Sequence, residues 1–492
     1  MALIAEPFSS SVRPVLRGVR GAISAAHPLA VAAGQQMLVA GGSAADATIA
    51  AQAVLCVIMP DACGLGGDMF ALVDPPEGDI VAINGAGAAP QRLVTAATDG
   101  ANSVTVPGIV DGWVSLHARW GRLTLAQVLA PAQDLAEQGV PVSATLAGAV
   151  QAQRARLLRG GAAAWDLLDL AAGQRFAQPR LAALLGAIGR EGASAFYQGA
   201  AAAAIETALA AGGGVLDRGD LARHRTPVLP AISVRFGAVE VAVQPPATQG
   251  VLLAMALQAL ERCDDPADAL IDHLCVELTE AAFMHRARVA EGAVLLALDL
   301  PIDPARAGHR GGPRAYLHTA GVAAVDGDGL VVSSLVSVFD DFGSCVFVPE
   351  LGITLNNRAG GFTDGANAAA PGKRPVHTLA PAIVRGPHGS LALATPGADG
   401  QVQTLLQVID RVFRRGEDLA SAIAAPRWRS EAGKLLIDRD HPWLGELASR
   451  GHQTVPLAGG DMRFGAVVAA GRIDGQPVAG ADWRRETWAG VT

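Results

Sequence analysis

The sequence predicts a mixed α+β protein that is helical in its first part and rich in strands in its second part. Apolar residues recur at three- and four-residue spacings through residues 29–58, and helices are also expected at 124–138, 143–158, 251–262 and 268–290. From about residue 319 the pattern changes to short apolar runs between glycine or asparagine turns, which is typical of strands. Half of the 492 residues are hydrophobic, so the chain can bury a large core.

The first helical region is predicted to contain two helices. Gly41 and Gly42 interrupt the apolar pattern of residues 29–58, Ser43 can cap the second helix, and Pro60 ends it. The alternation of helical segments continues after this region, with a broken helical stretch at 163–213 and a helix at 401–414.

Two early strands are flanked by glycine-rich turns. Residues 63–73 (CGLGGDMFALV) begin in a turn and continue as a strand, whereas residues 81–90 (VAINGAGAAP) form a strand that ends in a turn. Neither turn opens a helix inside a βαβ unit, so these glycines do not form a dinucleotide-binding fingerprint.

The composition argues against several classes of function. The net charge is −8 and there is no basic stripe, so neither nucleic acid nor an anionic membrane is expected as a partner. The five cysteines are odd in number and none has CxxC spacing, which favours reduced thiols over a disulfide framework or a zinc site. Residues 1–20 lack an apolar signal-peptide core and no apolar run reaches about 18 residues, so a cytoplasmic location is expected.

Thr319 stands where the helical pattern changes to strands. A threonine freed at an N-terminus can act as a nucleophile, because its hydroxyl attacks a carbonyl while its α-amine, which titrates near about 8, accepts the proton. No GxSxG elbow or Ser/His/Asp arrangement stands out as an alternative. A lone threonine at the start of a strand is more often structural, so the residue type alone does not decide its role.

Six sequence motifs occur along the chain, before, at and after Thr319. In chain order they are GGSAADATIAAQAVLCVIMPDACGLGGDMFALV (41–73), SVTVPGIVDGW (103–113), HTAGVAAVDGDG (318–329), LNNRAGGF (355–362), KRPVHTLAPAI (373–383) and ATPGADGQVQTLLQ (394–407). In content and order these blocks resemble the gamma-glutamyltranspeptidase family, whose members are self-cleaving N-terminal-nucleophile hydrolases. The resemblance covers roughly residues 20–430.

The resemblance implies a fold and a maturation step. The fold is the four-layer αββα sandwich of N-terminal-nucleophile hydrolases. Cleavage between His318 and Thr319 would give a large subunit of residues 1–318 and a small subunit of residues 319–492. The two would stay interleaved as a heterodimer, and a dimer of such heterodimers is compatible with the family.

The resemblance also implies roles for individual residues. Thr319 is the nucleophile, and Ser337 is the hydroxyl residue that hydrogen-bonds it, unless Ser337 simply faces a neighbouring strand. Gly397 and Ala398 match a turn whose backbone N–H groups form an oxyanion hole, provided that Ala398 avoids a positive φ. The residues that correspond to the family's substrate pocket are Asn356, Asn357, His377 and Thr378, of which the asparagines are equally compatible with a structural turn.

Two departures from the family concern how the substrate is held. Gamma-glutamyl enzymes bind the α-carboxylate of the substrate with an arginine where this chain has Ala86 or Ala88, and they bind the α-ammonium with acidic residues where it has residues 358–361 (RAGG). Arg358 would repel an ammonium but suits an anionic group, as in the oxamate amidohydrolase branch of the family. The alternative is a structural salt bridge, with Asp340 or Asp341 as partner.

These observations support three hypotheses. The first is an amidohydrolase that acts on a small, carboxylate-bearing, oxamate-like amide through an acyl-Thr319 intermediate, with no cofactor or metal. The second is a gamma-glutamyltransferase or glutathione hydrolase with a rearranged clamp. The third is an uncleaved, inactive binding protein on the same scaffold.

Overall fold

Two seven-stranded sheets lie face to face at the centre of the molecule. The computed structural model describes residues 12–263, 268–311 and 319–492. Neighbouring strands in both sheets run antiparallel. The first sheet has the order β21 (Trp488–Val491), β2 (Gly21–Ala25), β10 (Ala320–Asp326), β11 (Val331–Ser337), β3 (Asp68–Asp74), β4 (Val81–Gly85) and β7 (Val228–Pro230).

The second sheet has the order β1 (Leu16–Arg17), β20 (Gln476–Ala481), β19 (Val468–Ile473), β15 (Gly389–Ala394), β14 (Ala382–Gly386), β9 (Val239–Val243) and β8 (Ile232–Phe236). Three small sheets lie outside this pair: β5 (Val140–Pro141) with β6 (Arg175–Phe176), β12 (Phe347–Val348) with β13 (Ile353–Thr354), and β16 (Trp428–Glu431) with β17 (Lys434–Asp438) and β18 (Thr454–Leu457).

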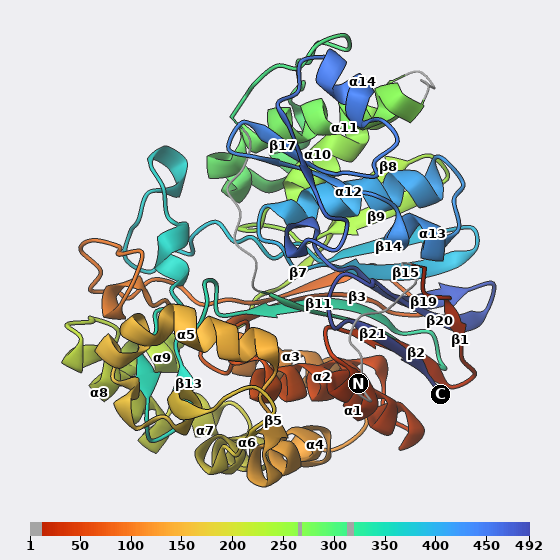
Figure 1. Ribbon diagram of the computed structural model, residues 1–492. Helices are drawn as coiled ribbons and strands as arrows, with labels where there is room; N and C mark the ends of the chain where they lie inside the picture. Colours follow the sequence, from red (N-terminus) through yellow and green to blue (C-terminus); the bar gives the residue numbers. More distant parts are fainter. Residues whose placement is uncertain (1–11, 264–267, 312–318) are drawn as a thin grey trace, which may run out of the picture.

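Helices cover the outer face of each sheet, which completes four layers (Figure 1). The layer below the first sheet contains α1 (Pro28–Val39), α2 (Ala44–Ile58), α3 (Ile109–Trp120), α4 (Leu125–Gln138), α5 (Ala144–Arg159), α6 (Pro179–Glu191), α7 (Ser194–Tyr197), α8 (Gly199–Ala211) and α9 (Arg218–Arg223). The layer above the second sheet contains α10 (Gly250–Glu261), α11 (Asp268–Phe283), α12 (Gly400–Phe413), α13 (Leu419–Ala424) and α14 (Leu444–Ser449).

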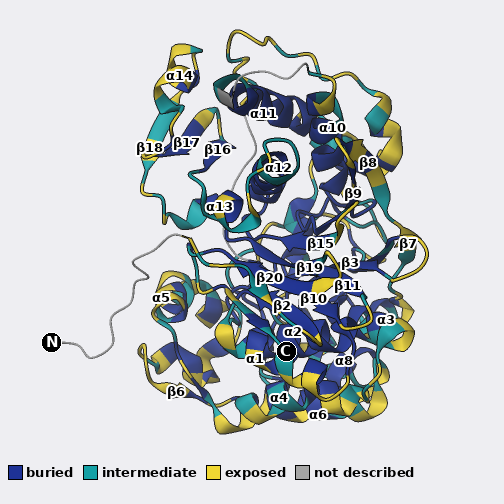
Figure 2. Cartoon of the chain, turned by 90° about the vertical axis from the view of Figure 1, so that its right-hand side faces the viewer, coloured by how far each residue is buried: buried dark blue, intermediate teal, exposed yellow. Residues whose placement is uncertain are grey.

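Three apolar cores separate these layers. One lies between the lower helices and the first sheet, a second lies between the two sheets, and a third lies between the second sheet and the upper helices. The central strands β2, β3, β10 and β11 are buried on both faces, whereas many exposed residues gather on the outer faces of the helices (Figure 2). The predicted αββα sandwich is therefore confirmed.

Both sheets combine strands from the two sides of Thr319. In the first sheet, β10 pairs with β2 on one side and with β11 on the other, and β11 pairs in turn with β3. In the second sheet, β14 lies between β15 and β9. Neither of the two seven-stranded sheets is complete on one side of Thr319 in the sequence, so residues before and after it depend on each other for burial.

The predicted start of the second helix is confirmed. The Ser43 hydroxyl accepts a hydrogen bond from the backbone N–H of Asp46 at 3.2 Å, and the Asp46 carboxylate accepts one from the backbone N–H of Ser43 at 2.9 Å. This reciprocal capping satisfies two backbone donors that the first turn of a helix leaves open. All of α2 is buried, which explains why its sequence is largely apolar.

Other expectations need correction. Of the two helices expected at 251–262 and 268–290, the first is confirmed as α10, whereas the second, α11, ends at Phe283. Irregular 3-10 turns follow it, and within them Gly292 adopts a φ of +62°. The strands before residue 319 are more numerous than predicted, and β2, β7, β8 and β9 are among those that were not expected. The residues of β8 (ISVRF) alternate between apolar and polar, as do the first three of β9 (VEVAV), so this hairpin was detectable in the sequence. Burial along the whole of β2 (GAISA) hides the period of two there.

Candidate active site

Three polar side chains form a row at one end of the first sheet. Thr319 immediately precedes β10, and the register in which Ala320 pairs with Val336 places Thr319 beside Ser337, the last residue of β11. Ser337 pairs in turn with Asp68, the first residue of β3. Directly opposed residues share a face of the sheet, and all three are buried. The strand pairing therefore brings together a hydroxyl before β10, a hydroxyl on β11 and a carboxylate on β3.

The Asp68 carboxylate lies in a fully buried charge cluster. Its Oδ2 accepts hydrogen bonds from Nε of Arg358 and from Nε2 of His377, both at 3.2 Å. Asp68 and Arg358 have no exposed surface. The Arg358 guanidinium also stacks on the ring of Phe339, 4.2 Å from its centroid. A buried carboxylate and a buried guanidinium stabilise each other when hydrogen bonds accompany the pair.

Arg358 forms an ion pair, but not with the partner expected from the sequence. It pairs with Asp68, whereas Asp340 or Asp341 was expected. The Asp340 carboxylate instead accepts a hydrogen bond from the Asn357 amide at 2.7 Å. Asp68 was not among the residues expected from the sequence. A carboxylate directly before the apolar run MFALV requires a cationic or hydrogen-bonding partner when the strand is buried, and that was the available signal.

His377 is neutral in this cluster. Its Nδ1 accepts a hydrogen bond from the backbone N–H of Leu379 at 3.2 Å, so the neutral ring carries its proton on Nε2, which donates a hydrogen bond to Asp68. Burial is the main reason that the pKa of His377 falls to about 3, and the neighbouring Arg358 cation lowers it further. The ring also packs against Phe70, with 4.4 Å between centroids.

The two asparagines bind the surrounding loops together. The Asn356 amide accepts a hydrogen bond from Thr105 N–H and donates to the carbonyls of Gly66 and Thr105. Asn357 donates to the Thr98 carbonyl and to Asp340. Both N–H groups of each amide are engaged inside the protein, which favours the structural turn over a substrate contact for Asn357.

The turn expected to form an oxyanion hole follows β15 and reaches the same end of the sandwich. Within the described chain, neither Gly397 nor Ala398 donates a backbone hydrogen bond, so both N–H groups are available. Ala398 has a φ of +50°, which contradicts the expectation that it avoids the left-handed region. This conformation costs an alanine roughly 1 kcal/mol. The Gln249 side chain holds the turn, because its Nε2 donates to the carbonyls of Ala398 at 2.8 Å and Thr378 at 2.6 Å.

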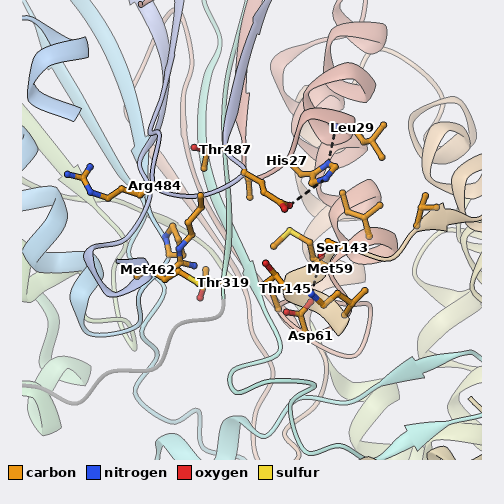
Figure 3. A pocket seen from close by; sticks show the side chains of 18 of the residues that line it. His27, Leu29, Met59, Asp61, Ser143, Thr145, Thr319, Met462, Arg484 and Thr487 are labelled. Atoms are coloured by element: carbon orange, nitrogen blue, oxygen red, sulfur yellow. Dashed lines mark hydrogen bonds and ion pairs between the residues drawn. The ribbon is translucent and has the colours of Figure 1, made fainter. Parts of the chain in front are cut away.

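A cavity of about 290 Å³ opens beside Thr319. Figure 3 shows Thr319 and Met462 on one wall, with Met59, Asp61, Ser143 and Thr145 across from them and His27 and Thr487 farther along. Most of the wall is apolar, and it also includes Leu29, Ile58, Val140, Leu146, Pro396, Arg484, Arg485 and Glu486. Such a space suits a small organic molecule with an apolar body.

Two of the charged residues on the cavity wall have defined surroundings. Arg484 forms an internal ion pair with Asp482 at 3.0 Å, and neither side chain is exposed. Arg485 donates from Nη2 to the Met462 carbonyl at 2.6 Å, and burial together with the Arg429 cation lowers its pKa to about 10. Arg485 therefore remains a cation at neutral pH. None of the residues 484–487 was expected from the sequence to belong to the site.

The remaining predicted residues fall into two groups. His377 and Thr378 are buried beside the Asp68 cluster and the Ala398 turn, respectively. His318, the other half of the expected cleavage site, lies outside the described residues.

No helix among the described residues is both long enough and apolar enough to span a bilayer.

Comparisons with known proteins show the family to which the chain belongs. The family model for gamma-glutamyltranspeptidase matches residues 30–299 and 303–491. The oxamate amidohydrolase proenzyme of Klebsiella pneumoniae is 33% identical, over 83% of this chain and 84% of its own length. The acylase ACY 1 proenzyme of Pseudomonas sp. strain V22 is 32% identical, over 96% and 95% of the two chains. The crystal structure of cephalosporin acylase from Bacillus halodurans superposes with a TM-score of 0.88 at 27% identity, covering 100% and 99% of the two chains.

Proposed function

Since the chain belongs to the gamma-glutamyltranspeptidase family and is an enzyme that acts on amide bonds, we propose that Thr319 is its nucleophile, freed by self-cleavage of the His318–Thr319 bond. The observation that carries this proposal is the position of Thr319, at the start of β10, beside Ser337 and on the wall of the cavity. The proenzyme names of the relatives support the cleavage step.

The proposed reaction has two stages. The Thr319 hydroxyl attacks the amide carbonyl, its proton passes to the α-amine of the same residue, and the N–H groups of Gly397 and Ala398 stabilise the oxyanion. The leaving amine takes up that proton as the C–N bond breaks, which leaves an ester on Thr319. Water then attacks the ester, releases the carboxylic acid and restores the hydroxyl. Ser337 would hold the Thr319 hydroxyl in position.

We propose a carboxylate-bearing amide as substrate, with oxamate-like amides first. The oxamate amidohydrolase relative supports this choice. Arg358, the anchor that the sequence suggested, is fully buried and paired with Asp68, so it could reach a substrate only if that pair opened. Arg485 lies on the cavity wall with Thr319, and its guanidinium suits a carboxylate. We therefore propose Arg485 as the anchor.

An acylase that accepts a longer acyl group is the second candidate. Oxamate has few atoms, whereas the cavity measures about 290 Å³ and its wall is largely apolar. The ACY 1 relative matches nearly the whole of this chain. An amide of an aliphatic dicarboxylic acid would fill such a cavity and still present a carboxylate to Arg485.

A substrate panel tests these candidates. The purified, processed protein is incubated with oxamate, glutathione and a monoamide of a longer dicarboxylic acid, and the release of ammonia, glutamate or dicarboxylic acid is followed. We expect turnover of oxamate or of the longer monoamide, and little release of glutamate, because residues 358–361 (RAGG) include no acidic residue to bind an α-ammonium. Glutathione as the best substrate by kcat/KM would overturn the carboxylate-amide proposal.

Replacement of the proposed anchor gives a second prediction. Arg485→Gln should raise KM for the preferred carboxylate-bearing amide by about 10- to 100-fold, because a charge-assisted hydrogen bond of about 1.5–3 kcal/mol is lost. The rate for the corresponding neutral amide should change little. Arg472→Gln, at an arginine remote from Thr319 that contacts the Gly475 and Gly327 carbonyls, is the control. Equal losses on the charged and neutral amides would argue against Arg485 as the anchor.

A further inference from the structure

A cluster of two histidines and one glutamate lies in the upper helical layer, away from the first sheet and Thr319. His273 and Glu277 are four residues apart on α11, so they project from the same side of that helix. His452 belongs to the loop between α14 and β18, and Figure 1 shows α14 next to α11. One ligand atom from each of the three lies within 4.8 Å of the other two, and all three residues are buried.

The imidazoles are arranged as metal-binding histidines commonly are. His273 donates from Nε2 to the backbone carbonyl of Asp303 at 3.0 Å, so its Nδ1 carries a lone pair. That Nδ1 lies 2.8 Å from Nε2 of His452. A backbone carbonyl that fixes the other ring nitrogen is the usual outer partner of a metal-bound histidine.

Glu277 has acceptor capacity beyond its present partners. The backbone N–H of Gly308 donates to both carboxylate oxygens, at 3.0 and 3.1 Å, and Arg310 donates to Oε2 at 2.5 Å. A carboxylate offers about four lone-pair sites, so Oε1 can still accept a cation. The Arg310 guanidinium, which also donates to the Pro301 carbonyl at 2.8 Å, would weaken such binding by charge repulsion.

We propose that His273, Glu277 and His452 bind one divalent transition-metal ion of the zinc type. Two neutral imidazoles and one carboxylate form a ligand set that suits zinc, and a water molecule can take the fourth position. The two ring nitrogens must move apart by about 0.5 Å to accept bonds of roughly 2.0–2.1 Å in tetrahedral geometry. The proton shared between the rings leaves Nε2 of His452, either for Nδ1 of the same ring or for solvent.

The site would join two parts of the chain. His273 and Glu277 precede Thr319 in the sequence and His452 follows it. If the proposed cleavage occurs, a bound ion therefore cross-links the two resulting subunits in the outer layer. This consequence rests on the proposed function, whereas the site itself does not.

Metal titration of the full-length protein tests the proposal. After treatment with a chelator, the protein is titrated with Co²⁺ and, separately, with Zn²⁺. We expect one Co²⁺ per chain with the visible absorption of a tetrahedral site, and a Zn²⁺-dependent rise of about 2 °C or more in the unfolding midpoint. Binding of less than about a tenth of an equivalent, or an unchanged midpoint, would overturn the proposal.

Variants separate this site from adventitious binding at the surface. His273→Gln and His452→Gln should each weaken Zn²⁺ binding by about 10-fold or more. His388→Gln, at an exposed histidine that pairs with Asp474, should leave it unchanged. Metal affinity that is equal in all of these variants would contradict the assignment.

The Arg310→Gln variant tests whether Glu277 binds a metal ion or serves only as the ion-pair partner of Arg310. Without the guanidinium, the buried Glu277 charge loses its partner, so the metal-free variant should unfold at a lower temperature. Zn²⁺ should bind this variant more tightly than it binds the unmodified protein and should restore the midpoint. A variant that Zn²⁺ fails to restore would show that Glu277 serves only Arg310.

Discussion

Replacing Thr319 by alanine should abolish both the cleavage of the chain and its amidase activity. The variant lacks the hydroxyl that attacks the peptide bond before residue 319, so the catalytic α-amine is never released. Denaturing electrophoresis should show one band near 50.0 kDa instead of fragments of about two-thirds and one-third of that mass. We expect kcat/KM to fall by about 10⁴-fold or more, as when other catalytic nucleophiles are removed.

Thr319→Ser is the matched control. Serine keeps a hydroxyl and, after cleavage, an α-amine, so this variant should still process and retain part of the activity. Because Thr319 is buried beside Ser337, the loss of one methyl group should slow both steps without unfolding the protein. A Thr319→Ala protein that remains cleaved or active would place the nucleophile elsewhere. An uncleaved wild-type protein with no activity on the substrate panel would support the inactive-scaffold hypothesis.

Replacing Asp68 by leucine should cause a large loss in the free energy of unfolding. The change leaves the guanidinium of Arg358 buried without its carboxylate, which typically costs about 3–5 kcal/mol. This cost is a large part of the roughly 5–15 kcal/mol that stabilises a folded protein. The measurement is the midpoint of denaturant-induced unfolding, compared at equal slope.

Two further variants make this prediction specific. Asp474→Asn removes an exposed carboxylate that lies 3.0 Å from His388, and it should cost less than about 0.5 kcal/mol. Asp68→Leu combined with Arg358→Met removes both charges and should regain part of the lost stability. A loss in Asp68→Leu no larger than that in Asp474→Asn would mean that the buried pair contributes little.

Local patterns in the sequence were sufficient to predict the first helices of the fold and the position of Thr319, the proposed nucleophile, at the start of a strand. The spacing of apolar residues predicted α2, and Ser43 caps it as expected. Motifs in a fixed order located Thr319 at the start of β10 and the Gly397–Ala398 turn after β15. These features depend on residues that are close together in the chain, so a linear pattern records them.

The cavity beside Thr319 could not be predicted in the same way. Its wall combines residues near positions 27, 60, 143, 462 and 485, and of these segments only the one near 60 lies in a block that resembles the family. The metal-binding proposal likewise unites His273 with His452, 179 residues later, so no short spacing reveals it. Strand pairing and helix packing bring such residues together, and sequence periodicity does not specify these contacts.

By itself, the sequence determined the layered α+β architecture, the change from helices to strands at Thr319, and the family to which the chain belongs. Only the tertiary structure decided that Arg358 pairs with Asp68, 290 residues away, and that Arg485 stands on the cavity wall with Thr319. It also decided that Ala398 adopts a positive φ. The physical reason is that a buried charge takes whichever partner the packing of the layers brings near, and a strained turn persists where surrounding contacts hold it.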